Sequence, residues 1–285
     1  MRILLVTKGD ATKWRTWSGV PRQELQRLES EGHEVRLLNL FDDPLFHFFG
    51  ALWNRLCDYK RHEFESTIIG GWLMARAVRC AAQGFDRVVA LTFALNAAKI
   101  GVPVELRHDW TLGYFWKCYD RTEARVLARM ACAAAIKCYY PASTRYLRDK
   151  GLNAEYVGLP VSVPDWVRAR IKGKSVNENG GRVVIFASTW HRDNLDEGLR
   201  YLGDRECTVD VIGMKGKSDT RIRYHGYLDK DCAEQAVKYW ELLIAADQML
   251  ALGTSWPGGS SIAEARACRC FVRTREWPDL GGHLV

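Results

Sequence analysis

The chain alternates short apolar runs with segments whose apolar residues recur every three or four positions. In the first half, the runs predict buried parallel strands at 2–7, 33–40, 86–92, 102–107 and 137–142. In the second half, they predict strands at 182–188, 207–213, 221–226, 248–252 and 270–274, with a helix near 231–246. Strands that alternate with helices in this way indicate a doubly wound α/β fold with parallel sheets.

A break in the pattern predicts two domains. Residues 163–181, VPDWVRARIKGKSVNENGG, combine Pro, Gly and Asn with clustered Arg and Lys, which is typical of a linker. A chain of 285 residues also suits two domains better than one. We therefore predict two Rossmann-like domains that face a cleft, residues 1–165 and residues 166–285.

Composition indicates a soluble protein of a reducing compartment. The chain is 47% hydrophobic and 26% charged, and no apolar stretch reaches the ~18–20 residues that cross a bilayer. Nine scattered cysteines without a C-x-x-C spacing predict neither a disulfide framework nor a zinc site. We therefore expect a cytoplasmic protein without a bound metal.

Net charge points to the first domain as the side that meets a negatively charged partner. The formal charge is +7, and most of the excess lies within residues 1–165. Such an excess favours a polyanion or an anionic membrane surface as partner. An ordinary basic protein with solvated surface charges is the alternative, and the sequence leaves both open.

The stretch ALGTSWPGGSSIAEARACRCFVRT, residues 251–274, places small residues directly ahead of a short helix. Backbone N–H groups at the positive end of a helix bind anions such as a diphosphate, and four residues are predicted to supply them: Gly258, Gly259, Ser260 and Ser261. Glu264, one turn further on, could hold sugar hydroxyls. Its structural alternative is an acid that stabilises the helix dipole.

The order of these pieces resembles the glycosyltransferases of the GT-B fold, and most closely the large retaining family numbered four. Residues 245–274 match the donor motif of that family without a gap. Three segments resemble its first domain: WSGVPRQELQRLESEGHEV (17–35), GVPVELRHDW (101–110) and AIKCYYPASTRYLRDKG (135–151). The resemblance implies transfer of a sugar from a nucleotide-diphosphate sugar, a UDP-sugar by family habit, with retention and without metal or other cofactor.

The resemblance also implies roles for single residues. Glu264 falls on the second acid of the family's E-x7-E motif and would bind the ribose hydroxyls. Ser18 and Gly19 would lie at the turn after the first strand, where a glycine lets the backbone approach the donor. His108 would contact the transferred sugar or the reaction centre, and Asp109 is the reserve candidate for a general base. A surface or capping role is the alternative for His108.

Cations for the diphosphate and contacts for the acceptor are expected elsewhere. Arg192 is the expected diphosphate cation, with Lys215 as a further candidate. Trp14, Arg15 and Trp17 lie beside the expected acceptor cleft, where rings could stack on sugars or bases. Asp229 and Asp231 imitate a metal-binding Asp-x-Asp pair, but they precede a helix and are interpreted as caps.

Two departures from the family pattern matter. Trp256 stands where the family has the first acid of E-x7-E, so either the donor sugar differs or its binding is weaker. The segment REWPDLGGHLV (275–285) resembles a Gly-Gly segment of the family and ends there, which predicts a minimal second domain or a truncated C-terminus.

Three functions remain open at this stage. The first is a transferase that builds a cell-envelope lipid or glycan, with peripheral membrane contact through the basic domain. The second is a viral-type transferase that modifies hydroxymethylated bases in duplex DNA. The third is a non-catalytic relative that binds nucleotide-sugars.

Overall fold

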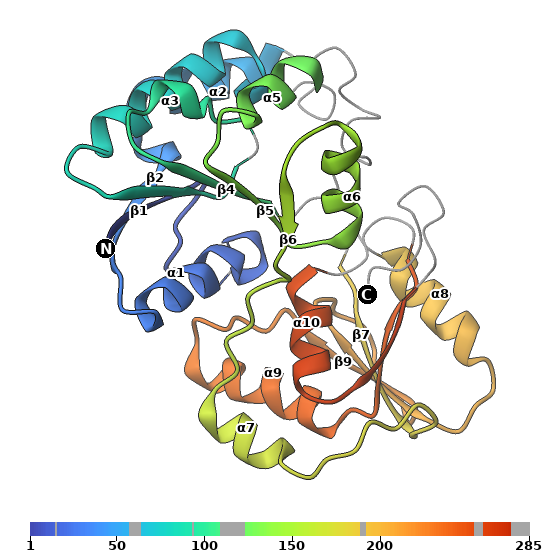
Figure 1. The fold of residues 1–285 in the computed structure, drawn as a ribbon. Coiled ribbons are helices and arrows are strands. Elements are labelled where there is room, and N and C mark those ends of the chain that lie inside the picture. Colours follow the sequence, from blue (N-terminus) through green and yellow to red (C-terminus); the bar gives the residue numbers. More distant parts are fainter. Residues whose placement is uncertain are drawn as a thin grey trace.

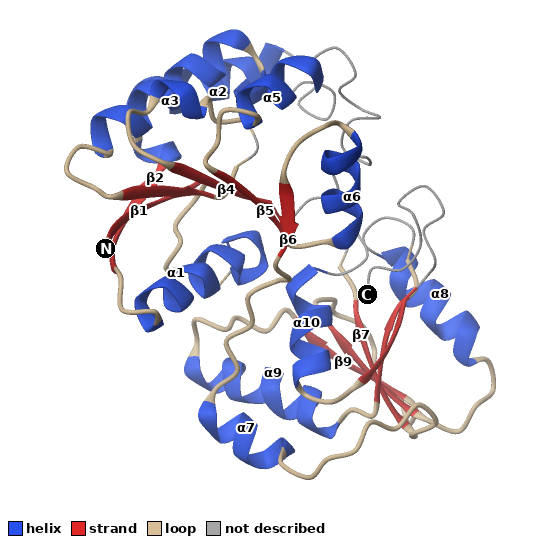
Figure 2. Ribbon diagram, viewed as in Figure 1, coloured by secondary structure: helices blue, strands red, loops and turns tan. Residues whose placement is uncertain are grey.

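Two parallel β-sheets, each covered by helices on both faces, form the fold (Figure 1, Figure 2). The computed structural model describes residues 1–14, 16–56, 64–92, 94–108, 123–188, 192–253 and 259–274. The first sheet uses strands from residues 2–156 and the second uses strands from residues 182–274. The predicted class, two Rossmann-like domains, is therefore confirmed, while the exact boundary at residue 165 stays a prediction.

The first sheet has the strand order β2-β1-β3-β4-β5-β6, and its described neighbours all pair in parallel. Its strands are β1 (Arg2–Thr7), β2 (Glu34–Asn39), β3 (Arg87–Ala90), β4 (Val104–His108), β5 (Ala135–Cys138) and β6 (Ala154–Tyr156). The chain winds outward in both directions from the boundary of β1 and β3. In open α/β sheets, ligands bind at the carboxyl ends of the strands that flank such a switch point.

Helices cover the two faces of this sheet unequally. Ile3 and Leu5 pack with helix α1 (Val20–Ser30), whereas Leu4 and Val6 point to the opposite face, because successive strand residues alternate. The opposite face carries α2 (Pro44–Leu56), α3 (Ile68–Ala81) and α5 (Glu123–Met130). The remaining described elements are α6 (Pro141–Asp149) and the 3-10 turns η1 (Thr16–Gly19), η2 (Leu40–Asp42), η3 (Phe64–Ser66) and η4 (Ala97–Lys99).

The second sheet has the order β11-β10-β7-β8-β9, also parallel, with its switch point between β7 and β10. The strands are β7 (Arg182–Phe186), β8 (Thr208–Ile212), β9 (Ile222–Gly226), β10 (Gln248–Ala251) and β11 (Phe271–Thr274). Helix α8 (Arg192–Leu202) packs on one face. On the other face lie α7 (Asp165–Ile171), α9 (Ala233–Ala245) and α10 (Gly259–Ala267).

Two local predictions differ from the structure. The strand expected at 137–142 begins earlier and ends at Cys138, because Pro141 opens α6, and proline favours the first turn of a helix. The expected linker at 163–181 contains α7, which buries Val167 and Ile171 in the core of the second sheet. Its clustered Arg residues belong to the exposed side of this helix.

Buried ion pairs fix α1 on the first sheet. Glu24 of α1 is 1% exposed, and its carboxylate accepts hydrogen bonds from Arg107 of β4, from Arg27 Nε at 2.9 Å and from the Tyr139 hydroxyl at 2.6 Å. Arg107 also pairs with the buried Glu105, 2.6 Å from its Nε atom. Because these charges are paired and hydrogen-bonded, α1 keeps a defined position from which neighbouring residues reach the second domain.

We expect Glu24 to shape the acid stability of the protein. Burial alone would raise the pKa of Glu24, but Arg107, Tyr139 and Arg27 outweigh burial and hold this pKa below its usual value. Such a carboxylate stabilises the fold above its unfolded pKa of about 4.3, and this contribution is lost as the pH falls through the folded pKa. Glu24→Gln should lower the free energy of unfolding at pH 7 by about 2–3 kcal/mol and flatten its acid decline.

Urea denaturation between pH 7 and pH 3 measures this prediction. The exposed Glu34 offers a matched control, since Glu34→Gln removes a carboxylate without breaking a buried pair. If the Glu24→Gln profile retains the full acid slope of the parent protein, the carboxylate is not the source of that slope.

Candidate functional site

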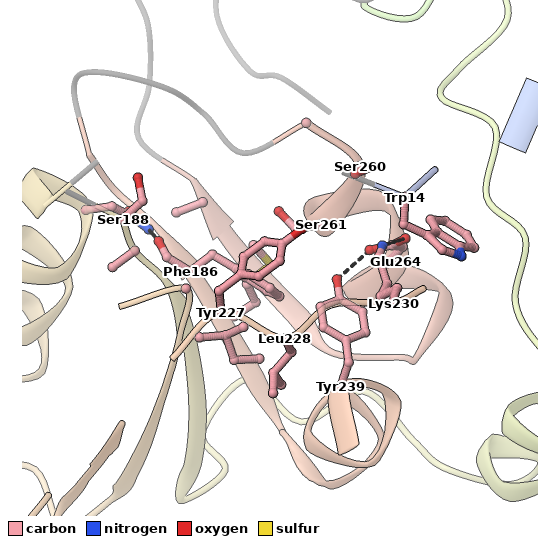
Figure 3. A pocket seen from close by; sticks show the side chains of 17 residues that line it. Trp14, Phe186, Ser188, Tyr227, Leu228, Lys230, Tyr239, Ser260, Ser261 and Glu264 are labelled. Carbon is pink, nitrogen blue, oxygen red and sulfur yellow. Dashed lines mark hydrogen bonds and ion pairs between the residues drawn. The ribbon is translucent and has the colours of Figure 1, made fainter. Parts of the chain in front are cut away.

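A cavity of about 310 Å³ opens at the carboxyl ends of the central strands of the second sheet (Figure 3). Phe186 and Ala187 at the end of β7, Ile212 and Gly213 at the end of β8, and Ala251 at the end of β10 line it. The cavity therefore lies at the switch point between β7 and β10. The strand order alone predicts a ligand site at this place.

The predicted glycine and serine lip borders this cavity. Gly259, Ser260 and Ser261 form the first turn of α10, and all three line the cavity. The backbone N–H groups of a first helical turn have no acceptor within the helix, and the positive end of a helix favours an anion. Gly258 and Trp256 lie outside the described residues.

Glu264 is fully buried and engaged by side chains from α1, from α9 and from the segment ahead of α9. Its Oε1 atom accepts from Lys230 Nζ at 2.7 Å and from Gln23 Nε2 at 3.1 Å, and its Oε2 atom accepts from the Tyr239 hydroxyl. Burial, together with the charge of Glu264, raises the pKa of Tyr239 well above 10, so the phenol remains a donor. An ionised carboxylate has about four acceptor positions, and three are used here. Ribose binding at Glu264 thus needs the fourth position or the displacement of a present partner.

Lys230 is the cation of the cavity. It is the single Lys or Arg among the described lining residues, and its side chain is only 11% exposed. The ammonium lies 4.4 Å from the ring centroid of Trp14 and 4.7 Å from that of Tyr239. Figure 3 shows Lys230, Tyr239 and Glu264 converging beside Trp14. Contacts with two ring faces and one carboxylate hold the charge at the edge of the cavity.

Trp14 lies over Gly19, and this contact requires a glycine. Gly19 precedes α1 with a φ of +84°, and a Cβ atom there would lie 2.4 Å from Cε3 of Trp14. The Trp14 ring therefore fills the space in which a side chain at position 19 would lie, and the approach of a donor to this glycine stays a prediction. Trp14 itself lines the cavity, so its ring is shared between the two domains.

Further contacts join the two domains beside the cavity. The Arg22 guanidinium of α1 pairs with Asp231 at 2.7 Å and lies 4.9 Å from the ring centroid of Trp14. The backbone N–H of Trp14 donates to the second oxygen of Asp231 at 3.1 Å. We call six residues the interdomain cluster: Trp14, Arg22, Gln23, Lys230, Asp231 and Glu264. The cap expected of Asp231 is not observed, because Cys232 occupies the N-cap position of α9.

The amide of Asn194 connects the two strands that flank the switch point. Its Nδ2 atom donates to the carbonyl of Phe186 at 2.7 Å, at the end of β7, and to that of Leu250 in β10 at 3.4 Å. Its Oδ1 atom accepts from the backbone N–H groups of Leu252 at 2.6 Å and Gly253 at 2.9 Å. With both donors and both lone pairs used, this one side chain sets the spacing of β7 and β10 under the cavity.

The other expected cations lie away from the cavity lining. Arg192 is the first residue of α8 and is exposed, and Lys215 is exposed in the segment after β8. Neither is among the described residues that line the cavity. Their role at a diphosphate stays a prediction, while Lys230 is the cation that lines the cavity among the described residues.

The remaining expected site residues are described in part or not at all. His108 ends β4 at the carboxyl edge of the first sheet, and Ser18 lies in η1 beside the start of α1. The side chains of His108, Ser18 and Trp17 lie outside the described part of the structure, as do Asp109 and Arg15 altogether. Within the residues that the structure does describe, no group of three or more His, Cys, Asp and Glu side chains could hold a metal ion.

Comparison with solved structures shows which known fold the chain has. No protein-family model and no curated protein matches the sequence. HepE from Anabaena, solved with UDP-glucose, matches with a TM-score of 0.57 and 16% identity over 96% of this chain and 80% of that one. Its structure with UDP and glucose gives a TM-score of 0.55, 15% identity and coverages of 95% and 80%. A glycosyltransferase from Rickettsia africae matches with a TM-score of 0.54 and 12% identity over 96% of this chain and 78% of that one.

The chain has the GT-B fold. At this level of identity the comparisons establish the arrangement of two facing domains and no more. In GT-B terms, β1 to β6 form the first domain, β7 to β11 form the second, and the interdomain cluster lies between them.

Sequence reasoning missed Lys230, Asn194 and Gln23. Lys230 stands between two acids ahead of α9, a setting that is typical of a solvated turn. Asn194 and Gln23 form hydrogen bonds with residues that lie 56 and 241 positions away in the chain. A usable signal exists only for Asn194, since polar residues that begin the helix after the first strand of a Rossmann-like domain lie at its switch point.

Proposed function

We propose that the protein is a glycosyltransferase that moves a sugar from a nucleotide-diphosphate sugar, a UDP-sugar, to an acceptor hydroxyl. One observation carries the proposal: the first turn of α10 opens into a cavity at the β7–β10 switch point of a GT-B fold. The similar structures of HepE with UDP and with UDP-glucose support the choice of donor. The likeness to family four supports retention of configuration.

The proposed donor spans the cavity from α10 to the end of β9. The diphosphate would contact the N–H groups of Gly259, Ser260 and Ser261, with Lys230 supplying positive charge. The nucleobase would lie against Tyr227 and Leu228, which line the cavity after β9. Tyr227 is 61% exposed and its ring stands within the cavity in Figure 3, where a base would stack on it.

The chemistry requires the charge of the leaving diphosphate to be neutralised as the bond between the sugar C1 and the phosphate oxygen breaks. The positive end of α10 and the Lys230 ammonium are placed to do this without a metal. The acceptor oxygen then bonds to C1 on the same face, and its proton passes to the leaving phosphate oxygen. We propose no protein nucleophile; His108 would contact the sugar, with Asp109 as reserve base.

We expect Tyr227→Ala to weaken nucleotide binding by about 1–3 kcal/mol, because it removes a stacking surface for the base. Tyr227→Phe keeps the ring and should bind like the parent protein. Calorimetric titration with UDP, and hydrolysis assays with a panel of UDP- and TDP-sugars, measure the effect. If the parent protein binds no nucleotide, the proposed function is wrong. If Tyr227→Ala binds as the parent does, the base lies elsewhere.

The same assays separate the remaining functions. Nucleotide binding without turnover of any donor, with all acceptors tested, would favour a non-catalytic relative. Binding to duplex DNA that weakens steeply between two salt concentrations in a gel shift would favour DNA as acceptor. We favour a lipid or glycan acceptor, for the reason given next.

A further inference from the structure

Helix α2 turns most of its apolar side chains away from the core. Of its 13 residues, only Phe46 is classed as buried. Five apolar residues are exposed by 39–73%: Leu45, Phe48, Phe49, Leu52 and Leu56. Their spacing of three and four places them along one stripe of the helix. A soluble domain normally turns such a stripe inward, so this helix presents its apolar side to something outside the domain.

Neighbouring elements extend the stripe into a face. Ile68, Ile69 and Trp72 at the start of α3 are exposed by 68%, 58% and 63%, and Phe41 in η2 by 49%. Helices α2 and α3 lie side by side on the outer face of the first domain in Figure 1. We define the apolar face by nine residues: Phe41, Leu45, Phe48, Phe49, Leu52, Leu56, Ile68, Ile69 and Trp72. Monomeric proteins rarely expose so many large apolar residues in one place.

Two cavities lie beside helix α2. One cavity of about 580 Å³ is lined by Phe49, Leu52, Leu56 and Ile68, and it reaches Phe64. A second cavity of about 330 Å³ lies on another side of α2, shares the buried Phe64 with the first and reaches Lys8. Lys8 directly follows β1, so this second cavity lies near the carboxyl edge of the first sheet.

Positive charge surrounds the apolar face. Helices α2 and α3 contain Arg55, Arg76 and Arg79 and no Asp or Glu. Arg79 and Lys99 share a groove with Ile68 and Trp72, and Arg125 borders the α2 side. Among the nearby acids in the described structure, Asp43 pairs with Arg76 at 3.3 Å and Glu65 pairs with Lys8. The exposed Asp42 beside Phe41 accepts from the Asn39 amide at 2.9 Å, so basic side chains outnumber the acids without an ion pair along the described rim.

We propose that the apolar face docks on an anionic lipid surface. Phe, Leu, Ile and Trp side chains would enter the boundary between headgroups and acyl chains, and the Arg and Lys rim would contact lipid phosphates. A second copy of the chain fits less well, because a twofold contact would bring the two basic rims together. That the acceptor is then a membrane lipid rests on the proposed function, whereas the docking itself does not.

Vesicle flotation tests the docking. The full chain should float with phosphatidylcholine vesicles that contain phosphatidylglycerol, and much less with phosphatidylcholine alone. The double variant Phe48→Ser/Trp72→Ser should bind the anionic vesicles more than about tenfold less well. Arg79→Glu/Lys99→Glu should lose a comparable amount and remove the preference for anionic lipid. Val237→Ser, which changes an exposed apolar residue of the second domain, should bind as the parent does.

Three outcomes would overturn the docking. The first two are parent-like flotation of Phe48→Ser/Trp72→Ser and no flotation of the parent protein. The third is a dimer in light scattering that Phe48→Ser/Trp72→Ser converts to a monomer, since a second copy would then cover the face. Calorimetry with UDP on the same variant keeps the two proposals apart: unchanged nucleotide binding with lost flotation supports docking, whichever acceptor is used.

Discussion

Replacing Lys230 by methionine is expected to lower the free energy of unfolding by about 3–5 kcal/mol and donor turnover by roughly a hundredfold. Methionine keeps most of the length of the side chain but lacks the ammonium that contacts the rings of Trp14 and Tyr239. It removes the charge that faces Glu264, a carboxylate with no exposed surface. An uncompensated buried charge destabilises the fold, and the proposed diphosphate loses its nearest cation.

A second variant separates these two effects. Lys230→Met/Glu264→Gln removes both charges, so most of the lost stability should return while turnover stays low. Lys238→Met, at an exposed lysine of α9 outside the cavity lining, is the matched control and should change neither quantity. Chemical denaturation measures the stability of each variant, and steady-state donor hydrolysis measures its turnover. A Lys230→Met protein that is as stable as its parent and binds UDP equally well would remove Lys230 from the site.

The strands were predictable because buried parallel strands are continuous apolar runs, as in Arg2–Thr7 and Arg182–Phe186. Strand β6 escaped prediction because only Ala154 of its three residues is buried. The helical pattern of α2 could not show that its apolar stripe faces outward. Periodicity gives the direction of a stripe relative to its own helix and says nothing of what covers it.

The site was predictable only where its chemistry is local. Gly259, Ser260 and Ser261 follow one another at a helix start, so their common position needs no tertiary contact. The place of Lys230 at the cavity is seen only with its contact to Trp14, which belongs to the other domain, so no local sequence pattern indicates it. Arg192 was expected as the cation because the resemblance to family four places a cation pair after the first strand of the second domain. Its exposed side chain begins α8 outside the described cavity lining, and its role stays a prediction.

Asn194→Leu should cost about 3–4 kcal/mol of unfolding free energy, although the two side chains are similar in volume. The substitution leaves two backbone carbonyls and two backbone N–H groups without the amide that joins them at the ends of β7 and β10. Each unpaired buried polar group costs about 1–3 kcal/mol, and relaxation of the strand ends recovers part of the sum. That relaxation alters the spacing of the strands under the cavity.

Nucleotide affinity should therefore fall together with stability, since β7 and β10 carry the walls of the proposed donor site. Asn179→Leu, at an exposed asparagine ahead of β7, is the matched control and should leave both values near those of the parent. Gly253→Ala perturbs the same connection from the other side, because its Cβ atom would lie 2.9 Å from the Asn194 backbone. If Asn194→Leu loses stability but keeps full UDP affinity in calorimetry, the strand spacing does not shape the donor site.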